Sequence, residues 1–315
     1  MYKIRFSFFP IIIILAIILS TTGFSCEYND HDYFKDNPNL KTLHEKTFKT
    51  EPGKRIEINA SQGDVNISSW TNNEVYIKVL GNTKAEEKLV FSFDEESGNI
   101  TVTAKKKGVF SNWFTSGIHL RFEVKVPGKF NTETYTSGGD ISIIAVDGIA
   151  NIKTSGGDIT LQDINGDIYA STSGGDITGK YLKGVIVLKT SGGDIKTSNT
   201  TGDLTAKTSG GDITFSANNA KIDASTSGGD ILGSYLGENL GIDVHTSGGN
   251  ILLKLPENFN ATAKLTTSGG HIECNHLLTN VEKKSKSKII ADINNGGPKL
   301  KVSTSGGDIS VLKNI

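Results

Sequence analysis

Six aspartates recur at intervals of 18 residues, and carboxylates at so regular a spacing could bind cations. Each is the fifth residue of a Thr-Ser-Gly-Gly-Asp-Ile segment. If the segments stack, like charges lie about 4.8 Å apart, and something must offset their repulsion. Bound Ca²⁺ would do so, because it prefers carboxylate and carbonyl oxygens. We call these six residues the aspartate ladder: Asp140, Asp158, Asp176, Asp194, Asp212 and Asp230.

A structural role explains the same aspartates without an ion. Each carboxylate could accept hydrogen bonds from backbone N–H groups or Ser/Thr hydroxyls of the turn. The calcium-binding nonapeptide G-G-x-G-x-D-x-U-x has a third glycine and an offset aspartate, which this repeat lacks. We therefore favour the structural role and expect no cofactor, with Ca²⁺ as the alternative.

The 18-residue period also predicts the fold. Looser copies of the segment begin at Thr246 and Thr267, and a complete copy returns at Thr304. So short a unit cannot bury a core alone and must stack on its neighbours. Apolar residues recur every nine positions from Ile159 to Ile231 and alternate with polar ones, which indicates strands with one buried face. The chain is thus predicted to be all-β, a β-solenoid of 18-residue coils with two short strands and Gly-Gly turns.

The paired glycines are predicted to be structural. A Gly-Gly pair lets the backbone take positive φ and turn sharply without a Cβ clash. The turn glycines are Gly138, Gly139, Gly156, Gly157, Gly174, Gly175, Gly192, Gly193, Gly210, Gly211, Gly228 and Gly229.

The N-terminus is predicted to be an export signal. Lys3 and Arg5 precede an apolar run over residues 6–19, which is short for a membrane-spanning helix of ~20 residues. Gly23-Phe24-Ser25-Cys26 is similar to a bacterial lipoprotein cleavage site, so Cys26 is the predicted lipidation site. The alternative is ordinary cleavage near Ser25, which would leave an unmodified cysteine.

Four segments are predicted along the chain. They are a signal peptide over 1–25, a polar tether over 26–53, degenerate N-terminal coils or a cap over 54–135, and the regular TSGGD solenoid with a C-terminal cap over 136–315. A small β-sandwich is the alternative for the third segment.

Little in the sequence indicates catalysis or a disulfide framework. Net charge is −1, which favours no nucleic acid, and one of the two cysteines lies at the processing site. His271, Cys274 and His276 are metal-ligating types, but residues along a strand need not converge, and we expect surface and core positions. There is no nucleophile motif or phosphate-binding glycine loop, and the acids follow the repeat. We predict that the protein is not an enzyme; a carbohydrate-active enzyme is the least favoured alternative.

The repeats resemble a known bacterial family. TSGGDI copies behind a lipoprotein-like signal, closing on the segment Gly296 to Val302 (GGPKLKV) and the copy at Thr304, are similar to the adhesin-like β-solenoids, the toast-rack type domains of unknown function, which are similar in style to head domains with a GIN motif. The resemblance covers roughly residues 54 to 315. It implies a setting in the bacterial cell envelope and supplies no site residues.

Together these features predict an exported, lipid-anchored, non-enzymatic protein of the bacterial envelope. We expect an outer-membrane lipoprotein or cell-surface protein with an adhesin-like role, held to the membrane by the lipid on Cys26. Its expected partner is a surface ligand, protein or polysaccharide, and not nucleic acid. The alternative is a periplasm-facing accessory or scaffold of an envelope-stress system.

Overall fold

The computed structural model describes residues 40–108 and 117–314 of the 315-residue chain. Residues Asn39–Ile315 form one compact unit, and its strands join a single hydrogen-bonded network. The elements are β1 (Lys41–Lys49), β2 (Arg55–Ala60), β3 (Asp64–Trp70), β4 (Glu74–Gly81), α1 (Thr83–Lys88), β5 (Leu89–Glu96), β6 (Asn99–Lys106), β7 (Leu120–Pro127), β8 (Asn131–Thr136), β9 (Ile141–Ile144), β10 (Ala150–Lys153), β11 (Ile159–Asn165), β12 (Ile168–Ser171), β13 (Ile177–Lys189), β14 (Ile195–Lys207), β15 (Ile213–Ser225), β16 (Ile231–Leu236), β17 (Ile242–His245), β18 (Ile251–Leu255), β19 (Ala261–Thr267), β20 (Ile272–Cys274), β21 (Leu278–Lys284), β22 (Lys288–Ile293), β23 (Lys299–Thr304) and β24 (Ile309–Lys313).

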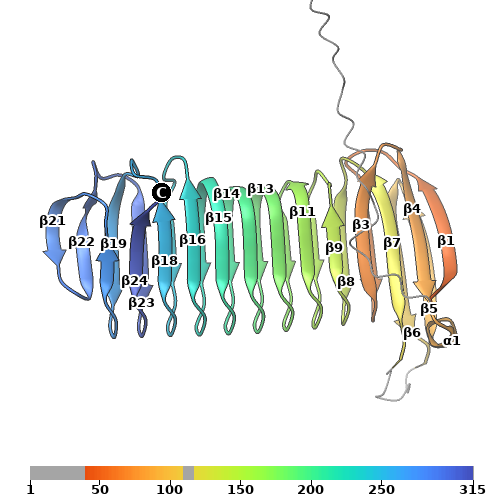
Figure 1. Cartoon of the computed structure of the whole chain (residues 1–315). Helices are drawn as coiled ribbons and strands as arrows, with labels where there is room; N and C mark the ends of the chain where they lie inside the picture. Colours follow the sequence, from red (N-terminus) through yellow and green to blue (C-terminus); the bar gives the residue numbers. More distant parts are fainter. Residues whose placement is uncertain (1–39, 109–116, 315) are drawn as a thin grey trace, which may run out of the picture. The chain divides into compact units, whose positions relative to one another are not determined.

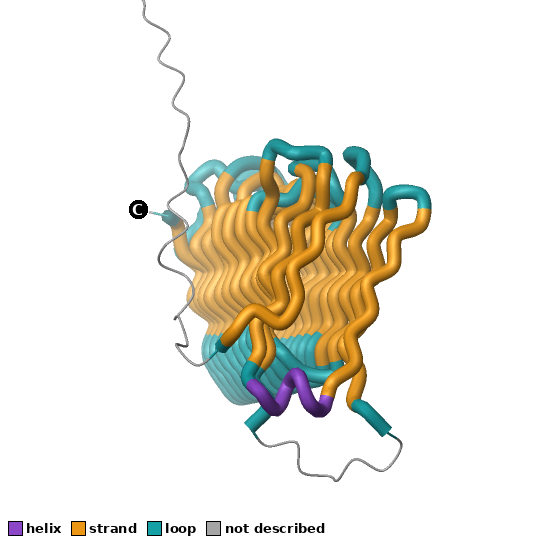
Figure 2. The backbone as a smooth tube through the Cα atoms, turned by 90° about the vertical axis from the view of Figure 1, so that its right-hand side faces the viewer, coloured by secondary structure: helices purple, strands orange, loops and turns teal. Residues whose placement is uncertain are grey.

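Two layers of parallel strands face each other through the regular part (Figure 2). We call them layer A, with β3, β9, β11, β16, β18, β24 and β20, and layer B, with β6, β2, β8, β10, β12, β17, β23 and β19. The long strands β13, β14 and β15 bend at a corner and contribute to both layers. Each coil crosses from layer B to layer A through a Thr-Ser-Gly-Gly turn and returns through the corner. The predicted all-β solenoid is confirmed.

The core is a narrow band of aliphatic side chains between the layers. Neighbouring coils pair in register, so that Ile159, Ile177 and Ile195 lie side by side, and each is at most 1% exposed. Side-chain sizes complement one another between coils. Phe215 lies against Gly233, where an added Cβ would overlap its ring. The apolar band accounts for the nine-residue period, because each coil contributes inward residues from both layers.

The coils do not stack in sequence order at either end (Figure 1). Near the N-terminus, β2 lies between β6 and β8, and β3 lies between β7 and β9. Near the C-terminus, β23 lies between β17 and β19, and β24 lies between β18 and β20. The last coil in the sequence is therefore held one position inside the end of the stack.

Antiparallel strands close both ends of the stack. Strand β4 pairs with β7 and β1, β5 pairs with β6, and the β21–β22 hairpin pairs with β19. The predicted tether over 26–53 is wrong for residues 41–49, which form β1. The sequence gives no clear signal for this strand because none of its side chains is buried, and its backbone pairing with β4 holds it in place. The signal peptide and Cys26 lie outside the described residues.

Candidate functional site

The threonine of each repeat joins neighbouring coils. Thr190 is buried; its Oγ1 donates to the carbonyl of Gly175 in the preceding coil at 2.9 Å and accepts from the N–H of Gly193 at 3.3 Å. The same pair of bonds recurs at Thr154, Thr172, Thr208, Thr226, Thr246, Thr267 and Thr304. These hydroxyls are therefore unavailable to a ligand.

The two glycines of each turn have different roles. A Cβ on Gly193 would overlap the carbonyl oxygen of Gly175, whereas a Cβ on Gly192 would meet nothing closer than 3.6 Å. The prediction that these glycines supply positive φ holds at Gly139, where φ is 143°. It is wrong for the other eleven predicted turn glycines. The second glycine is needed because consecutive coils approach each other there. Positive φ occurs instead at the opposite corner, at residues such as Tyr181 and Gly184.

Each aspartate of the ladder accepts a backbone hydrogen bond from the next coil. The Oδ1 atom of Asp194 accepts from the N–H of Asp212 at 2.8 Å. The series begins at Asp64 and passes through the six ladder residues. Asn250 continues it by accepting from the N–H of Asp308 at 2.9 Å. Because an amide oxygen serves as well as a carboxylate, this contact needs an acceptor and not a charge.

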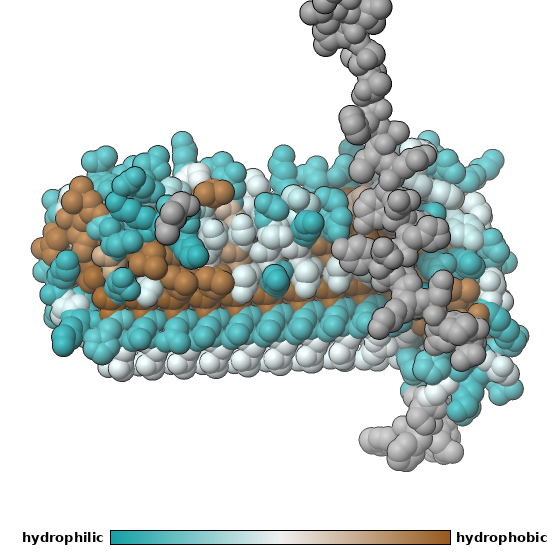
Figure 3. All heavy atoms as spheres, in the orientation of Figure 1, coloured by the Kyte–Doolittle hydropathy of each residue, from teal (hydrophilic) through white to brown (hydrophobic). Residues whose placement is uncertain are grey.

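The physical end of the stack coincides with the loss of that acceptor. His271 takes the place of aspartate in its copy and donates its N–H to Asp308 Oδ1 at 2.7 Å. No coil is stacked beyond β20 among residues 40–108 and 117–314, so no N–H there requires an acceptor from position 271. Figure 3 shows the turn edge as a continuous hydrophilic row along the stack.

A metal centre is not formed by the described part of the chain: no three His, Cys, Asp or Glu side chains are placed there to hold an ion. His271 is exposed, while Cys274 is a half-buried free thiol whose pKa is raised by burial. His276 is 5% exposed, and burial lowers its pKa. These three residues belong to one end of the stack and do not make a cluster.

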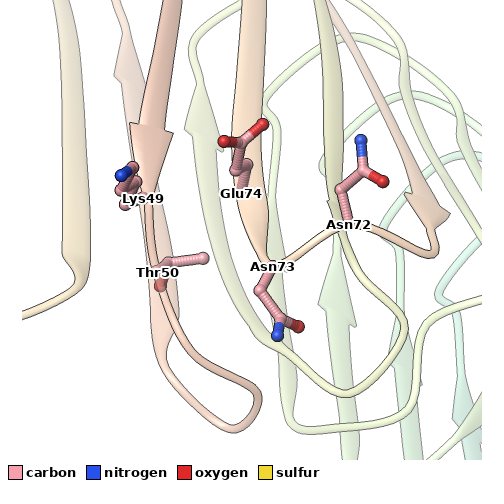
Figure 4. Close-up of a pocket in the computed structure, with 5 residues that line it drawn as sticks. All are labelled: Lys49, Thr50, Asn72, Asn73 and Glu74. Carbon is pink, nitrogen blue, oxygen red and sulfur yellow. The ribbon is translucent and has the colours of Figure 1, made fainter.

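A polar hollow of about 490 Å³ lies at the end of β1 (Figure 4). It is lined by Lys49, Thr50, Asn72, Asn73 and Glu74. Thr50 is already engaged, since its Oγ1 donates to the carbonyl of Gly98 at 2.5 Å. In Figure 4 the Asn73 amide and the Glu74 carboxylate point in different directions, so this hollow lacks converging groups for catalysis.

A second hollow, of about 380 Å³, lies where layer B meets the first turns. Tyr135 is 38% exposed in it and lies between Asn59 on β2 and Lys153 on β10. The full lining is Asn59, Ala60, Ser61, Lys105, Tyr135, Thr136, Ser137, Lys153 and Ser155. Sequence reasoning missed this hollow because β2 lies between β6 and β8 only through the non-sequential stacking. The one available signal was a tyrosine and a lysine 18 residues apart.

The comparison with known families identifies the fold. The family model of Toastrack DUF4097 matches residues 53–312. The chain belongs to this family. The resemblance to toast-rack domains is thereby confirmed, and the family description assigns no reaction or ligand.

Several solved structures are similar to this Toastrack chain. They include a "putative adhesin" from Bacteroides fragilis (12% identity, TM-score 0.36, covering 90% of this chain and 100% of that one). A "putative cell adhesion protein" from Clostridium sporogenes matches with 11% identity and TM-score 0.23, over 87% of this chain and 100% of that one. A "putative adhesin" from Parabacteroides merdae matches with 13% identity and TM-score 0.32, over 89% and 98% of the two chains.

No curated protein matches the chain. Across the described residues, none of the helices has the length and apolar character needed to cross a membrane.

Proposed function

We propose that this protein is an exported, lipid-anchored component of the bacterial cell envelope that acts as a non-enzymatic, adhesin-like binding surface. The observation that carries the proposal is that different residues of each coil serve the contacts between coils and the outer surface. The threonine, second glycine and aspartate of the repeat are used in coil-to-coil contacts, whereas no strand or helix of the described residues covers the outward faces of the two layers. The repeated residues thus form the stack of coils, and the outward-facing residues are the ones that can bind a partner.

A non-enzymatic role is supported by the two hollows. Among the described residues, no lining hydroxyl of either hollow forms a hydrogen bond with a lysine or carboxylate side chain that could activate it. Both are open hollows on the surface, of the kind that binds part of a larger partner and not an enclosed substrate.

The lipid anchor is supported by the sequence around Cys26. A basic start, a short apolar run and a small polar stretch precede it. A diacylated N-terminus would anchor the protein stably, because two acyl chains hold a protein to a bilayer far more firmly than one.

The test is accessibility on intact cells. Surface protease and antibody should reach the wild-type protein, and Cys26→Ala should release it from the membrane fraction. Cys274→Ala is the matched control and should behave as wild type, since that thiol lies in the solenoid. Complete protection of the wild-type protein on intact cells would contradict the surface role and favour the periplasm-facing scaffold. Membrane retention of Cys26→Ala would contradict the lipid anchor.

A further inference from the structure

We propose that the outer face of layer B binds an acidic polysaccharide, with the hollow around Tyr135 as its principal site. This inference rests on the proposed binding role and adds the class of ligand. We call the surface the lysine face and define it by Lys105, Tyr135, Lys153 and Lys189, which project from β6, β8, β10 and β13.

The hollow offers the groups that a charged sugar needs. The exposed ring of Tyr135 can pack against the C–H face of a pyranose, because its π face is electron-rich. Ser137 and Ser155 can exchange hydrogen bonds with sugar hydroxyls. Asn59 Nδ2 already donates to Glu57 and Ser61 Oγ to the carbonyl of Ala104, so these two residues can offer their oxygens as acceptors. Lys105 and Lys153 lie on either side of the tyrosine, where an ammonium group can meet a carboxylate or sulfate.

Some charged side chains on this face form ion pairs and others do not. Two acids beside the hollow share a cationic partner: Arg55 contacts Glu133 at 3.0 Å and Glu57 at 3.9 Å. Lys207 contacts Asp223 at 2.9 Å. In contrast, Lys105, Lys153 and Lys189 form no ion pair with any residue of the described ranges. The line of Tyr135, Lys153 and Lys189 therefore carries uncompensated positive charge, although Asp203 on β14 is an exposed acid of layer B without an ion pair in those ranges and the chain as a whole has a net charge of −1.

The spacing favours a linear polyanion. Strands β8, β10, β12 and β13 are successive neighbours in layer B, so that Tyr135, Lys153 and Lys189 follow one line across the sheet. Neighbouring strands are about 4.8 Å apart, which places the two lysines roughly 10 Å from each other. Ser171 lies between them, and Tyr169 projects nearby with 44% of its surface exposed.

Other polyanions fit this face less well. Nucleic acid carries a charge about every 3.4 Å along each strand and needs a denser row of cations. A peptide that binds by strand addition needs an open sheet edge, but here the backbone of the strands is paired on both sides within the layer. Sparse charge, hydroxyl partners and an exposed ring match a polyuronate or a sulfated glycan.

The test is binding of defined polymers to the purified full-length chain, measured by calorimetry at 50 and 200 mM salt. The probes are polygalacturonate, dextran sulfate, neutral dextran and polyglutamate. We expect polygalacturonate or dextran sulfate to bind, and the responding polymer tells carboxylate from sulfate. Lys153→Gln and Tyr135→Ala should each weaken that binding at least tenfold, whereas Tyr135→Phe should retain it because the ring remains.

Lys196→Gln is the matched control, because Lys196 is an exposed lysine on the outer face of layer A. It should bind as wild type. Equal loss in Lys196→Gln, equal affinity for polyglutamate, or undiminished binding by Tyr135→Ala would each overturn the proposal, since they indicate unspecific charge attraction. Absence of binding to both acidic glycans would overturn it as well. Circular dichroism of each variant separates lost binding from lost fold.

The two proposals fail separately. Accessibility on intact cells does not depend on polymer binding, so a shaved, lipid-anchored protein that binds no acidic glycan contradicts only the lysine face. Glycan binding by the purified chain together with complete protection on cells contradicts only the surface location.

Discussion

The middle of the stack and its two ends follow different rules. From β9 to β16 each coil contacts the coils that precede and follow it in the sequence. At both ends a coil from elsewhere in the chain is inserted, and antiparallel strands cover what remains. The middle is thus built from contacts at short sequence separation, and the ends from contacts that close long loops.

The difference shows what a repeat specifies. The TSGGD segment determines how one coil sits on the next, through its threonine, second glycine and aspartate. It does not determine which coil comes next, because any copy presents the same contacts. The variant copies explain the order at the C-terminal end. TSGGH, which lacks a side-chain oxygen at His271, fits the outermost turn, and the complete copy at Thr304 fits an inner one.

Deleting one coil should have very different effects on stability in the middle of the stack and at its C-terminal end. Deleting residues 190–207 brings β15 onto β13, with Asp176 able to accept from the N–H of Asp212 and Phe215 facing Gly179 in place of Thr197. We expect this variant to fold with cooperative melting. Deleting residues 299–315 removes the coil that joins β18 to β20 and should abolish the cooperative transition. Thermal unfolding followed by circular dichroism measures both, and equal damage by the two deletions would refute the distinction.

A methyl group tests the close approach of coils in the middle. Gly193→Ala should destabilise the protein by about 4 kcal/mol or prevent folding, because its Cβ would overlap backbone that cannot move aside. Gly192→Ala should change the free energy of unfolding by less than about 1 kcal/mol, since the neighbouring space is open. Urea denaturation of both variants supplies the comparison. Similar losses in the two would mean that turn conformation, and not coil contact, requires the glycines.

Two buried threonines test what each hydroxyl contributes. Thr190→Val removes a donor to Gly175 and an acceptor for Gly193, and should cost about 2 kcal/mol. Thr197→Val should instead stabilise the protein by about 1 kcal/mol, because its buried hydroxyl has no partner in the described structure. The two shifts in urea midpoint should have opposite signs; the same sign for both would contradict the assignment.

The smallest expected effect concerns the first aspartate of the series. Burial, together with the nearby charge of Asp140, raises the pKa of Asp64 above its ordinary value of 3.8. A raised carboxyl pKa favours the folded state below pH 3.8, and this contribution is lost as pH rises through the folded-state value. Asp64→Asn keeps the acceptor for the Asp140 N–H, so it should leave stability unchanged near pH 3 and raise it slightly at pH 7. Unfolding free energies at both pH values measure this, and a loss at pH 7 would contradict it.

Much of the middle was predictable from the sequence, because the same residues recur at each position of the coil. The 18-residue period predicted the strands, and the Thr-Ser-Gly-Gly segment predicted the turn that connects them. The order of the end coils was not predictable, since it depends on contacts between segments such as β2 and β6 that share no local pattern. The lysine face was missed for the same reason, as Lys105 and Tyr135 come together only through that order.

The measurement that tests the difference between middle and ends most directly is disulfide cross-linking across layer A, with both native cysteines replaced by serine. Ser310 lies opposite both Leu252 and Glu273, so those two residues are separated by a whole strand. Leu252→Cys with Ser310→Cys should cross-link on oxidation, as neighbouring Cα atoms about 4.8 Å apart can be bridged. Leu252→Cys with Glu273→Cys, at roughly 10 Å, should not. Efficient cross-linking of the second pair and none of the first would show that the coils stack in sequence order, and would contradict the account.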